Sequence, residues 1–164
     1  MKQVSIPSGA SLTALYRELA GDYPKFFKMD TLSKLGFLLA EMLVKEDPDR
    51  FRPRQDRAVL VFSREGSVVN DRHYAESMAD FPSPALFVYT LPNIVSGEIA
   101  IRNAYAGETS AFVLEEYDRE RIFELARLAF QDPETESALL IWADCHTDTD
   151  WDARAWLVEK TELL

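Results

Sequence analysis

The stretch Ser83-Pro-Ala-Leu-Phe-Val-Tyr-Thr-Leu-Pro-Asn93 decides how this sequence is interpreted. Thr90 is a good N-cap residue, and Pro92 fits a first helical turn, where a missing N–H costs little. Apolar side chains then recur at helical spacing, which predicts a helix that ends near Asn103. Gly97 lies inside this helix, and a glycine there usually indicates that another backbone comes close.

Strands and helices alternate on both sides of this stretch. The continuous apolar run Ala58–Phe62 is typical of a strand buried on both faces, whereas Ala155–Lys160 alternates and predicts a strand at the sheet edge. Together the elements predict a layered α/β sandwich with a mixed, largely parallel sheet. Its strands are predicted at Lys2–Ile6, Ala58–Phe62, Ser110–Leu114, Ala138–Ala143 and Ala155–Lys160, and its helices at 12–20, 31–45, 73–78, 90–103 and 119–131.

Composition bounds the functions that the chain can have. It has 164 residues, 47% of them apolar, which suits a single domain over residues 1–164. Its formal net charge of −10 disfavours nucleic acid and anionic membrane surfaces as partners. With one cysteine, no intramolecular disulfide can form. We find no apolar run that would span a bilayer and no leader peptide, so we expect a soluble, cytoplasmic protein.

Several segments, taken in order, resemble the amino-terminal half of a β-ketoacyl synthase (3-oxoacyl-ACP synthase), a member of the thiolase superfamily. The resemblance extends from about residue 28 to residue 160. It is strongest over Ser83–Asn93 and the helix that continues to Gly107. The segments that carry it are Lys28–Lys34, Ala58–Gly66, Ser83–Asn93, Gly97–Ile101, Arg121–Phe130 and Ala138–Asp144.

The resemblance implies half of a thiolase-like sandwich: a five-stranded mixed sheet with helices on its faces. It also places the family's nucleophile turn at 114–118. A condensing enzyme needs a cysteine there to accept an acyl group, but this turn contains Glu115 and Glu116. The family's two catalytic histidines belong to its carboxy-terminal half, and neither His73 nor His146 matches them. We therefore expect no catalytic residues for condensation.

The same resemblance implies association with a partner. A lone half should leave a hydrophobic face uncovered, and in the family the strand before the nucleophile pairs across the dimer axis. We expect a homo-oligomer, or a heterodimer with a full-length ketosynthase in fatty-acid or polyketide biosynthesis. The predicted dimer edge comprises Ser110, Ala111, Phe112, Val113 and Leu114. An acyl carrier protein is a further candidate partner, for which the basic loop offers Arg50, Arg52, Arg54 and Arg57.

Two alternative functions stay open. The chain could be an acyl-processing enzyme, a decarboxylase or transferase, that uses Glu115 or Glu116. It could also be a small acyl-ligand-binding module with an apolar cavity beneath the helix Leu91–Asn103. No cofactor is expected in any of these three interpretations.

Three other groups of residues suggest chemistry but have simpler explanations. Cys145 and His146 are neighbours at a strand end, so their side chains should point apart. The run Asp148–Asp152, with Glu159 beyond it, has the carboxylate spacing of a calcium loop, but Ala153 replaces the turn glycine. We therefore expect an acidic loop and no metal. The aromatic cluster of Tyr23, Phe26 and Phe27 fits a lid over the core, or a surface that faces a partner.

Overall fold

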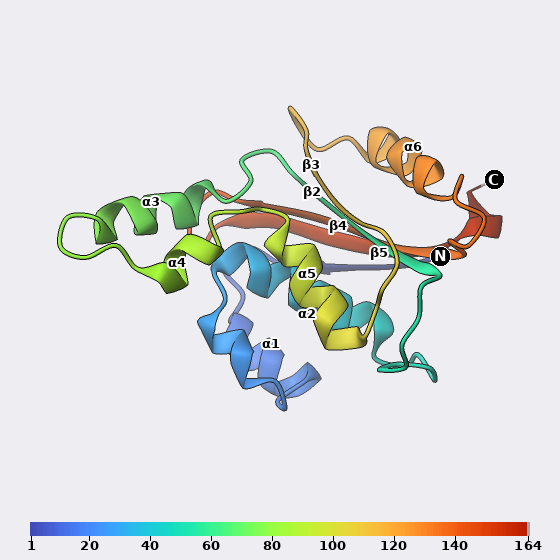
Figure 1. The fold of residues 1–164 in the computed structure, drawn as a ribbon, viewed down its shortest axis with the longest axis horizontal. Coiled ribbons are helices and arrows are strands. Elements are labelled where there is room, and N and C mark those ends of the chain that lie inside the picture. Colours follow the sequence, from blue (N-terminus) through green and yellow to red (C-terminus); the bar gives the residue numbers. More distant parts are fainter. Residues whose placement is uncertain (164) are drawn as a thin grey trace.

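In the computed structural model, which describes residues 1–163, a five-stranded mixed sheet lies between helices on its two faces (Figure 1). The strand order is β1-β5-β4-β2-β3; β2, β3 and β4 run parallel, and β5 runs antiparallel to both of its neighbours. The strands are β1 (Lys2–Ile6), β2 (Arg57–Ser63), β3 (Thr109–Val113), β4 (Ser137–Cys145) and β5 (Trp151–Glu159). This is the predicted fold class.

Six α-helices and two short 3-10 helices complete residues 1–163. The helices are α1 (Leu12–Leu19), α2 (Thr31–Val44), α3 (Val68–Ser77), α4 (Pro84–Val88), α5 (Ile94–Asn103) and α6 (Arg119–Ala129), with 3-10 helices η1 (Pro24–Lys28) and η2 (Lys160–Glu162). None of the helices in residues 1–163 combines the length and the apolar character that a bilayer crossing requires.

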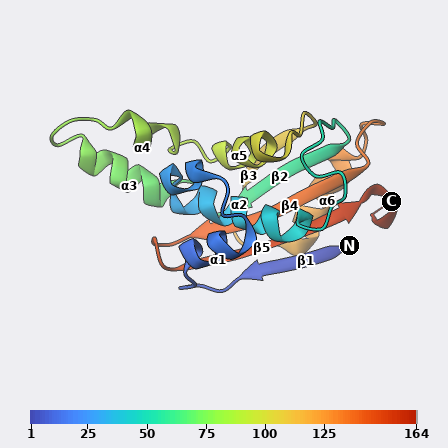
Figure 2. The same cartoon turned by 90° about the horizontal axis from the view of Figure 1, so that it is seen from below.

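Helices α1, α2 and α5 cover one face of the sheet, and α6 covers the other (Figures 1 and 2). Helix α2 begins where Asp30 accepts a hydrogen bond from the Ser33 N–H at 3.0 Å, and nearly all of its side chains are buried beneath α1 and α5. Helix α6 begins in the same way at Asp118, whose carboxylate accepts from the Arg121 N–H at 3.0 Å. Both helices therefore begin at the residues where the sequence predicts them.

The helix predicted from Thr90 begins later than predicted, and a separate short helix precedes it. Ser83 accepts a hydrogen bond from the Leu86 N–H, and Pro84 occupies the first turn, so α4 forms where no helix is predicted. Thr90 does not cap a helix; its hydroxyl donates to the Phe87 carbonyl at the end of α4. Helix α5 begins four residues later, after Asn93.

The glycines that allow close packing are Gly36 and Gly107. An added Cβ at Gly36 would collide with Val95 on α5, so this glycine sets the close approach of α2 and α5. At Gly107 an added Cβ would lie 2.6 Å from the Arg57 carbonyl oxygen, so only glycine fits where β3 begins beside β2. The prediction for Gly97 is wrong, because no atom lies within 4 Å of the Cβ position there.

Strand β5 is longer than predicted and lies inside the sheet. It begins at Trp151, and it pairs with β4 on one side and β1 on the other. The predicted edge position is therefore wrong. The pairing of Lys2 with Leu157 shows the reason, since β1 comes from the opposite end of the sequence and covers that edge.

The expected uncovered hydrophobic face is absent from the part of the chain described. On the α6 side, the sheet beyond the helix carries polar residues, including the exposed Gln3 and Ser5. Large exposed apolar side chains gather instead on α3, α4 and their connections. These two helices project beyond the ends of the strands (Figure 1). We call residues 68–88 the α3–α4 arm. The apolar side chains on it and directly after it are Met78, Phe81, Phe87, Val88 and Leu91.

Candidate functional site

Strand β3, which contains most of the predicted dimer edge, lies at one edge of the sheet. It pairs with β2 on one side, and no strand among residues 1–163 covers its other side. Val59 N donates to Glu108 O, and Leu114 N donates to Ser63 O, so the even-numbered residues of this segment bond to β2. Because consecutive residues of a strand point their amides in opposite directions, the backbone groups of Thr109, Ala111 and Val113 point outward.

The side chains of β3 divide between the two faces of the sheet. Phe112 packs on the α6 side, where its ring stacks on Phe62 with centroids 5.1 Å apart. Val113 is 66% exposed, and Ile101 on the adjacent helix α5 is 67% exposed. The free edge of the sheet is therefore flanked by exposed apolar side chains.

The predicted nucleophile turn follows β3 directly and contains no thiol. Glu115 and Glu116 are both exposed, between the end of β3 and the start of α6. Neither lines the cavity at the carboxyl ends of β2 and β4. The two carboxylates of this turn therefore lie in solvent and not in that enclosed site.

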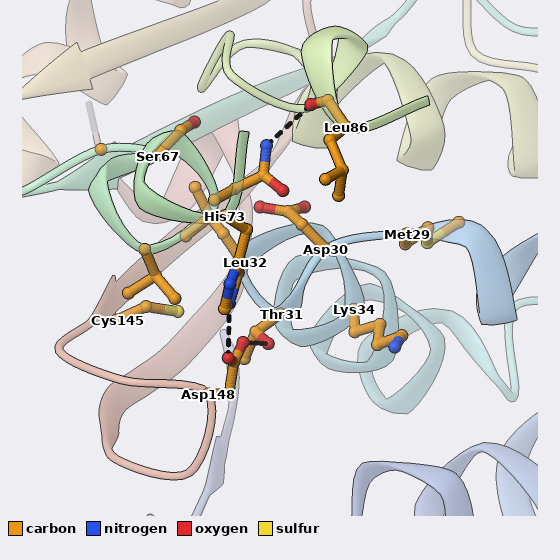
Figure 3. Close-up of a pocket in the computed structure, with 13 residues that line it drawn as sticks. Met29, Asp30, Thr31, Leu32, Lys34, Ser67, His73, Leu86, Cys145 and Asp148 are labelled. Carbon is orange, nitrogen blue, oxygen red and sulfur yellow. Dashed lines mark hydrogen bonds and ion pairs between the residues drawn. The ribbon is translucent and has the colours of Figure 1, made fainter. Parts of the chain in front are cut away.

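A cavity of about 200 Å³ lies at the carboxyl ends of β2 and β4, at the base of the α3–α4 arm (Figure 3). Its wall combines the start of α2, the start of α3, Leu86 on α4 and the end of β4. Sequence reasoning did not find it, because these four segments meet only in the folded chain. The residues that line it are Met29, Asp30, Thr31, Leu32, Lys34, Gly66, Ser67, Val69, Asn70, His73, Leu86, Cys145 and Asp148.

A hydrogen-bonded group occupies one side of this cavity. Asp148 accepts from the Thr31 hydroxyl at 2.6 Å with one carboxylate oxygen, and its other oxygen lies 2.7 Å from His73 Nε2 (Figure 3). Burial raises the pKa of Asp148, but the hydrogen bonds from Thr31 and His73 outweigh it, so that this pKa lies below its usual range. Asp148 is therefore a fixed anion near neutral pH.

Cys145 also lines the cavity, but it does not pair with His146. His146 lies near a different carboxylate, with its Nδ1 3.9 Å from Asp144 Oδ2, and the histidine that shares the cavity with Cys145 is His73. Burial, with the nearby anion Asp30 next in weight, raises the pKa of the Cys145 thiol far above its usual range. The thiol is therefore protonated and a poor nucleophile.

The carboxylates of the acidic loop have separate partners. Asp148 bonds to Thr31 and His73, Asp150 accepts from the Ser8 hydroxyl at 2.8 Å, and Asp152 accepts from Trp142 Nε1 at 3.0 Å. Among residues 1–163, no group of His, Cys, Asp and Glu side chains is arranged to hold a metal ion. Asp148 and Asp150 lie in the loop between β4 and β5, whereas Asp152 belongs to β5 itself.

The predicted basic loop carries little free positive charge. Arg50 pairs with the buried Glu41, Arg52 with Asp49, Arg54 with Asp56, and the buried Arg57 with Asp47. Arg50 connects the loop to α2 and Arg57 connects it to β2, whereas Arg52 and Arg54 pair within the loop. These arginines do not form the free basic patch that docking of an acidic carrier protein would need.

The aromatic cluster after α1 belongs largely to the core. Phe26 is fully buried and stacks on Tyr16 with centroids 4.3 Å apart, while Tyr23 stacks on Phe37. Phe27 is 55% exposed and packs its ring edge against the other aromatic rings. The cluster is a lid over the core with one exposed ring.

Comparison with solved structures shows which fold this is. The chain resembles a chain in the structure of the ketosynthase ApeO in complex with its chain length factor ApeC from Xenorhabdus doucetiae, with a TM-score of 0.70 and 16% identity over 98% of this chain and 77% of that chain. It also resembles the ishigamide ketosynthase/chain length factor, with a TM-score of 0.73 and 17% identity over 90% of this chain.

The fold is that of ketosynthase structures. The chain spans only about half, 48%, of the ishigamide ketosynthase/chain length factor chain that it matches. No protein-family model matches the sequence, and no curated protein sequence matches it. At 16% and 17% identity, the likeness establishes the architecture, and function has to be argued from the residues of this chain.

Proposed function

We propose that this chain is a non-catalytic ketosynthase-like subunit that pairs with a full-length ketosynthase in polyketide or fatty-acid biosynthesis. The proposal treats the chain as one domain equivalent to the amino-terminal half of such an enzyme. Both structural neighbours contain a ketosynthase together with a chain length factor, which is the kind of pairing that we propose here.

The observation that carries the proposal is the free edge of β3. Its outward N–H and C=O groups at Thr109, Ala111 and Val113 can extend the sheet by pairing with a strand of another chain. Val113 and Ile101 provide exposed apolar surface on the same flank, and the α3–α4 arm provides more. Such surface is typical of a face that a partner covers.

The chemistry of the turn after β3 supports a non-catalytic role. The residues at 114–118 are Leu, Glu, Glu, Tyr and Asp, and none of them can act as an acyl-accepting thiol. Cys145 lies in a different place, and burial raises its pKa so that it stays protonated. We therefore favour a partner subunit over an acyl-processing enzyme that uses Glu115 or Glu116.

The third interpretation, an acyl-ligand-binding module, requires an apolar cavity beneath α5. The space beneath that helix is filled, because Val95 fits against Gly36 and Ile99 is fully buried. An acyl chain would have to displace these side chains to enter.

The test is co-expression of the chain with the ketosynthases of its source organism, followed by affinity purification and light scattering. We expect a stable heterodimer with one of them. In the variant Ala111→Pro, the edge loses an outward N–H that β2 does not use, so the fold should survive while pairing weakens at least about tenfold. The matched control Ala111→Val keeps the N–H and should pair as the wild type does.

Two outcomes would contradict the proposal. One is a chain that stays monomeric and binds no ketosynthase, and the other is equal pairing of the Pro and Val variants. A homodimer that Ala111→Pro dissociates would retain the edge as an interface but would replace the ketosynthase with a second copy of this chain.

A further inference from the structure

The cavity at the base of the α3–α4 arm is separate from the free edge of β3, which carries the proposed pairing. None of the residues that line it belongs to β3 or to the turn at 114–118. It opens at the carboxyl ends of the parallel strands β2 and β4, which is where α/β proteins bind small ligands. Apolar side chains supply the larger part of its wall surface, and seven polar or charged residues share it. The apolar side chains are Met29, Leu32, Val69, Leu86 and Cys145.

One of those polar groups is a buried amide with a free acceptor. Asn70 is only 2% exposed, and its Nδ2 donates to the Leu86 carbonyl at 2.9 Å. Within residues 1–163 the Asn70 Oδ1 atom accepts no hydrogen bond. This oxygen is not fully buried, so it can be reached from the cavity. This oxygen is therefore free to accept a hydrogen bond from water or from a ligand in the cavity.

The second free acceptor is the Asp30 carboxylate, which points into the middle of the cavity (Figure 3). Apart from its own backbone N–H, Ser33 is the one residue of the described chain that donates to it, which leaves lone pairs unused. Burial raises the pKa of Asp30 above its usual range, although the bonds from Ser33 and the charge of Lys34 act in the opposite direction. A cation beside this carboxylate would relieve the cost of its burial.

Most of the remaining polar groups in the wall already have partners, but the buried Ser67 hydroxyl has no hydrogen-bond partner within residues 1–163. Asp148 is bonded to Thr31 and His73, and the Lys34 ammonium lies 5.7 Å from the centroid of the Phe26 ring. The groups left to recognise a ligand are therefore the free acceptors of Asp30 and Asn70 and the hydroxyl of Ser67. Because the Asp30 carboxylate lies in the middle of the cavity and a hydroxyl can also accept, this combination favours a hydrogen-bond donor with a positive charge.

We propose that this cavity binds a small aliphatic amine as its ammonium ion. The –NH₃⁺ group has three donors, enough to reach both Asp30 and Asn70, and a short hydrocarbon body fits the apolar wall. The volume of about 200 Å³ limits the ligand to roughly six groups of the size of water, at about 30 Å³ each.

The probe is isobutylammonium chloride, titrated into the wild-type chain by calorimetry and followed by amide NMR. Isobutanol and isobutyrate serve as matched neutral and anionic probes. We expect the amine to bind at least about tenfold more tightly than either of them. The amide shifts should be confined to residues around Asp30, Asn70 and His73.

The decisive variant is Asp30→Asn. Asparagine is as good an N-cap as aspartate, so α2 should keep its start while the cavity loses its charge. We expect Asp30→Asn to bind the amine at least about tenfold more weakly. The matched control is Asp118→Asn, the same change at the N-cap of α6 on the other face of the sheet, which should bind as the wild type does.

Three results would overturn the proposal: equal binding of isobutanol and the amine, unchanged binding in Asp30→Asn, or no shift around the cavity at saturating amine. The first two would mean that the cavity recognises apolar shape alone. All of these measurements use the isolated chain, so their failure leaves the pairing through β3 unaffected, and failure of that pairing leaves this proposal unaffected.

Discussion

His73 Nε2 lies 2.7 Å from Asp148 Oδ2, and this contact fastens the α3–α4 arm to the loop between β4 and β5. The second oxygen of the same carboxylate accepts from the Thr31 hydroxyl at 2.6 Å. One aspartate therefore joins the arm, the loop and the start of α2. The position of the arm and the shape of the cavity depend on the same side chain.

Replacing His73 with alanine should loosen the arm without unfolding the protein. Because the pair is exposed, with side-chain exposures of 44% and 51%, we expect the free energy of unfolding to fall by no more than about 1 kcal/mol. Amide hydrogen exchange in α3 should become faster, since the helix loses its tether. The control is His146→Ala, and unchanged exchange in α3 of His73→Ala would contradict the role of the contact.

The pKa of Asp148 predicts a dependence on acid. The bonds from Thr31 and His73 hold this pKa below its usual value in the folded chain, despite the opposing effect of burial. The carboxylate therefore stabilises the fold above its unfolded pKa of about 4, and this contribution disappears as the pH falls through the lower folded value. Urea unfolding should show Asp148→Asn less stable than wild type at pH 7 and nearly equal at pH 2. The same difference at both pH values would be inconsistent with this mechanism.

Features that depend on local chemistry could be predicted from the sequence. Asp30 and Asp118 cap their helices because a short carboxylate can reach the free N–H groups two or three residues ahead. The buried run Ala58–Phe62 could be identified as a central strand for a similar reason, since every residue in it is apolar. The resemblance to ketosynthases, carried by ordered segments, agrees with the fold of the solved neighbours.

Features that depend on contacts distant in sequence could not be predicted. The alternation after Ala155 indicates one wet face, but pairing of β1 with β5 determines that this strand lies inside the sheet. The same holds for the cavity, where Asp30, Asn70 and Cys145 come from three separate segments. Local patterns do not encode which strands become neighbours, so the edge and the cavity appear only in the folded chain.

A pair of alanine substitutions tests the packing at two glycines. In Gly107→Ala the new Cβ would lie 2.6 Å from the Arg57 carbonyl oxygen, and backbone cannot yield easily, so we expect a loss of about 3 kcal/mol. In Gly97→Ala nothing lies within 4 Å, and α5 should gain up to about 1 kcal/mol from the better helix former. Chemical unfolding measures both, and a Gly107→Ala variant as stable as wild type would contradict the close approach of β3 and β2.

The thiol of Cys145 should be unreactive in the folded protein. Burial raises its pKa, the anions around it add to the effect, and the side chain is 1% exposed. We expect iodoacetamide at pH 8 to alkylate the native chain far more slowly than the urea-unfolded chain, as mass spectrometry can follow. Incubation with acyl-carrier substrates should leave the protein mass unchanged. Rapid native labelling, or an acyl adduct on any residue, would refute the non-catalytic assignment.

The buried Glu41 should be the most sensitive charged residue of the loop contacts. It is 1% exposed and accepts from both Arg50 and Arg102, which are 11% and 10% exposed. Glu41→Gln keeps the shape but removes the carboxylate that pairs with Arg50 and one of the two that pair with Arg102, which keeps Asp22, so we expect a loss of about 3 kcal/mol. The comparison is Arg52→Ala, which breaks a pair with exposures of 77% and 58% and should change stability by less than about 0.5 kcal/mol. If both variants lower the free energy of unfolding by the same amount, burial of the Glu41 ion pairs does not determine their contribution to stability.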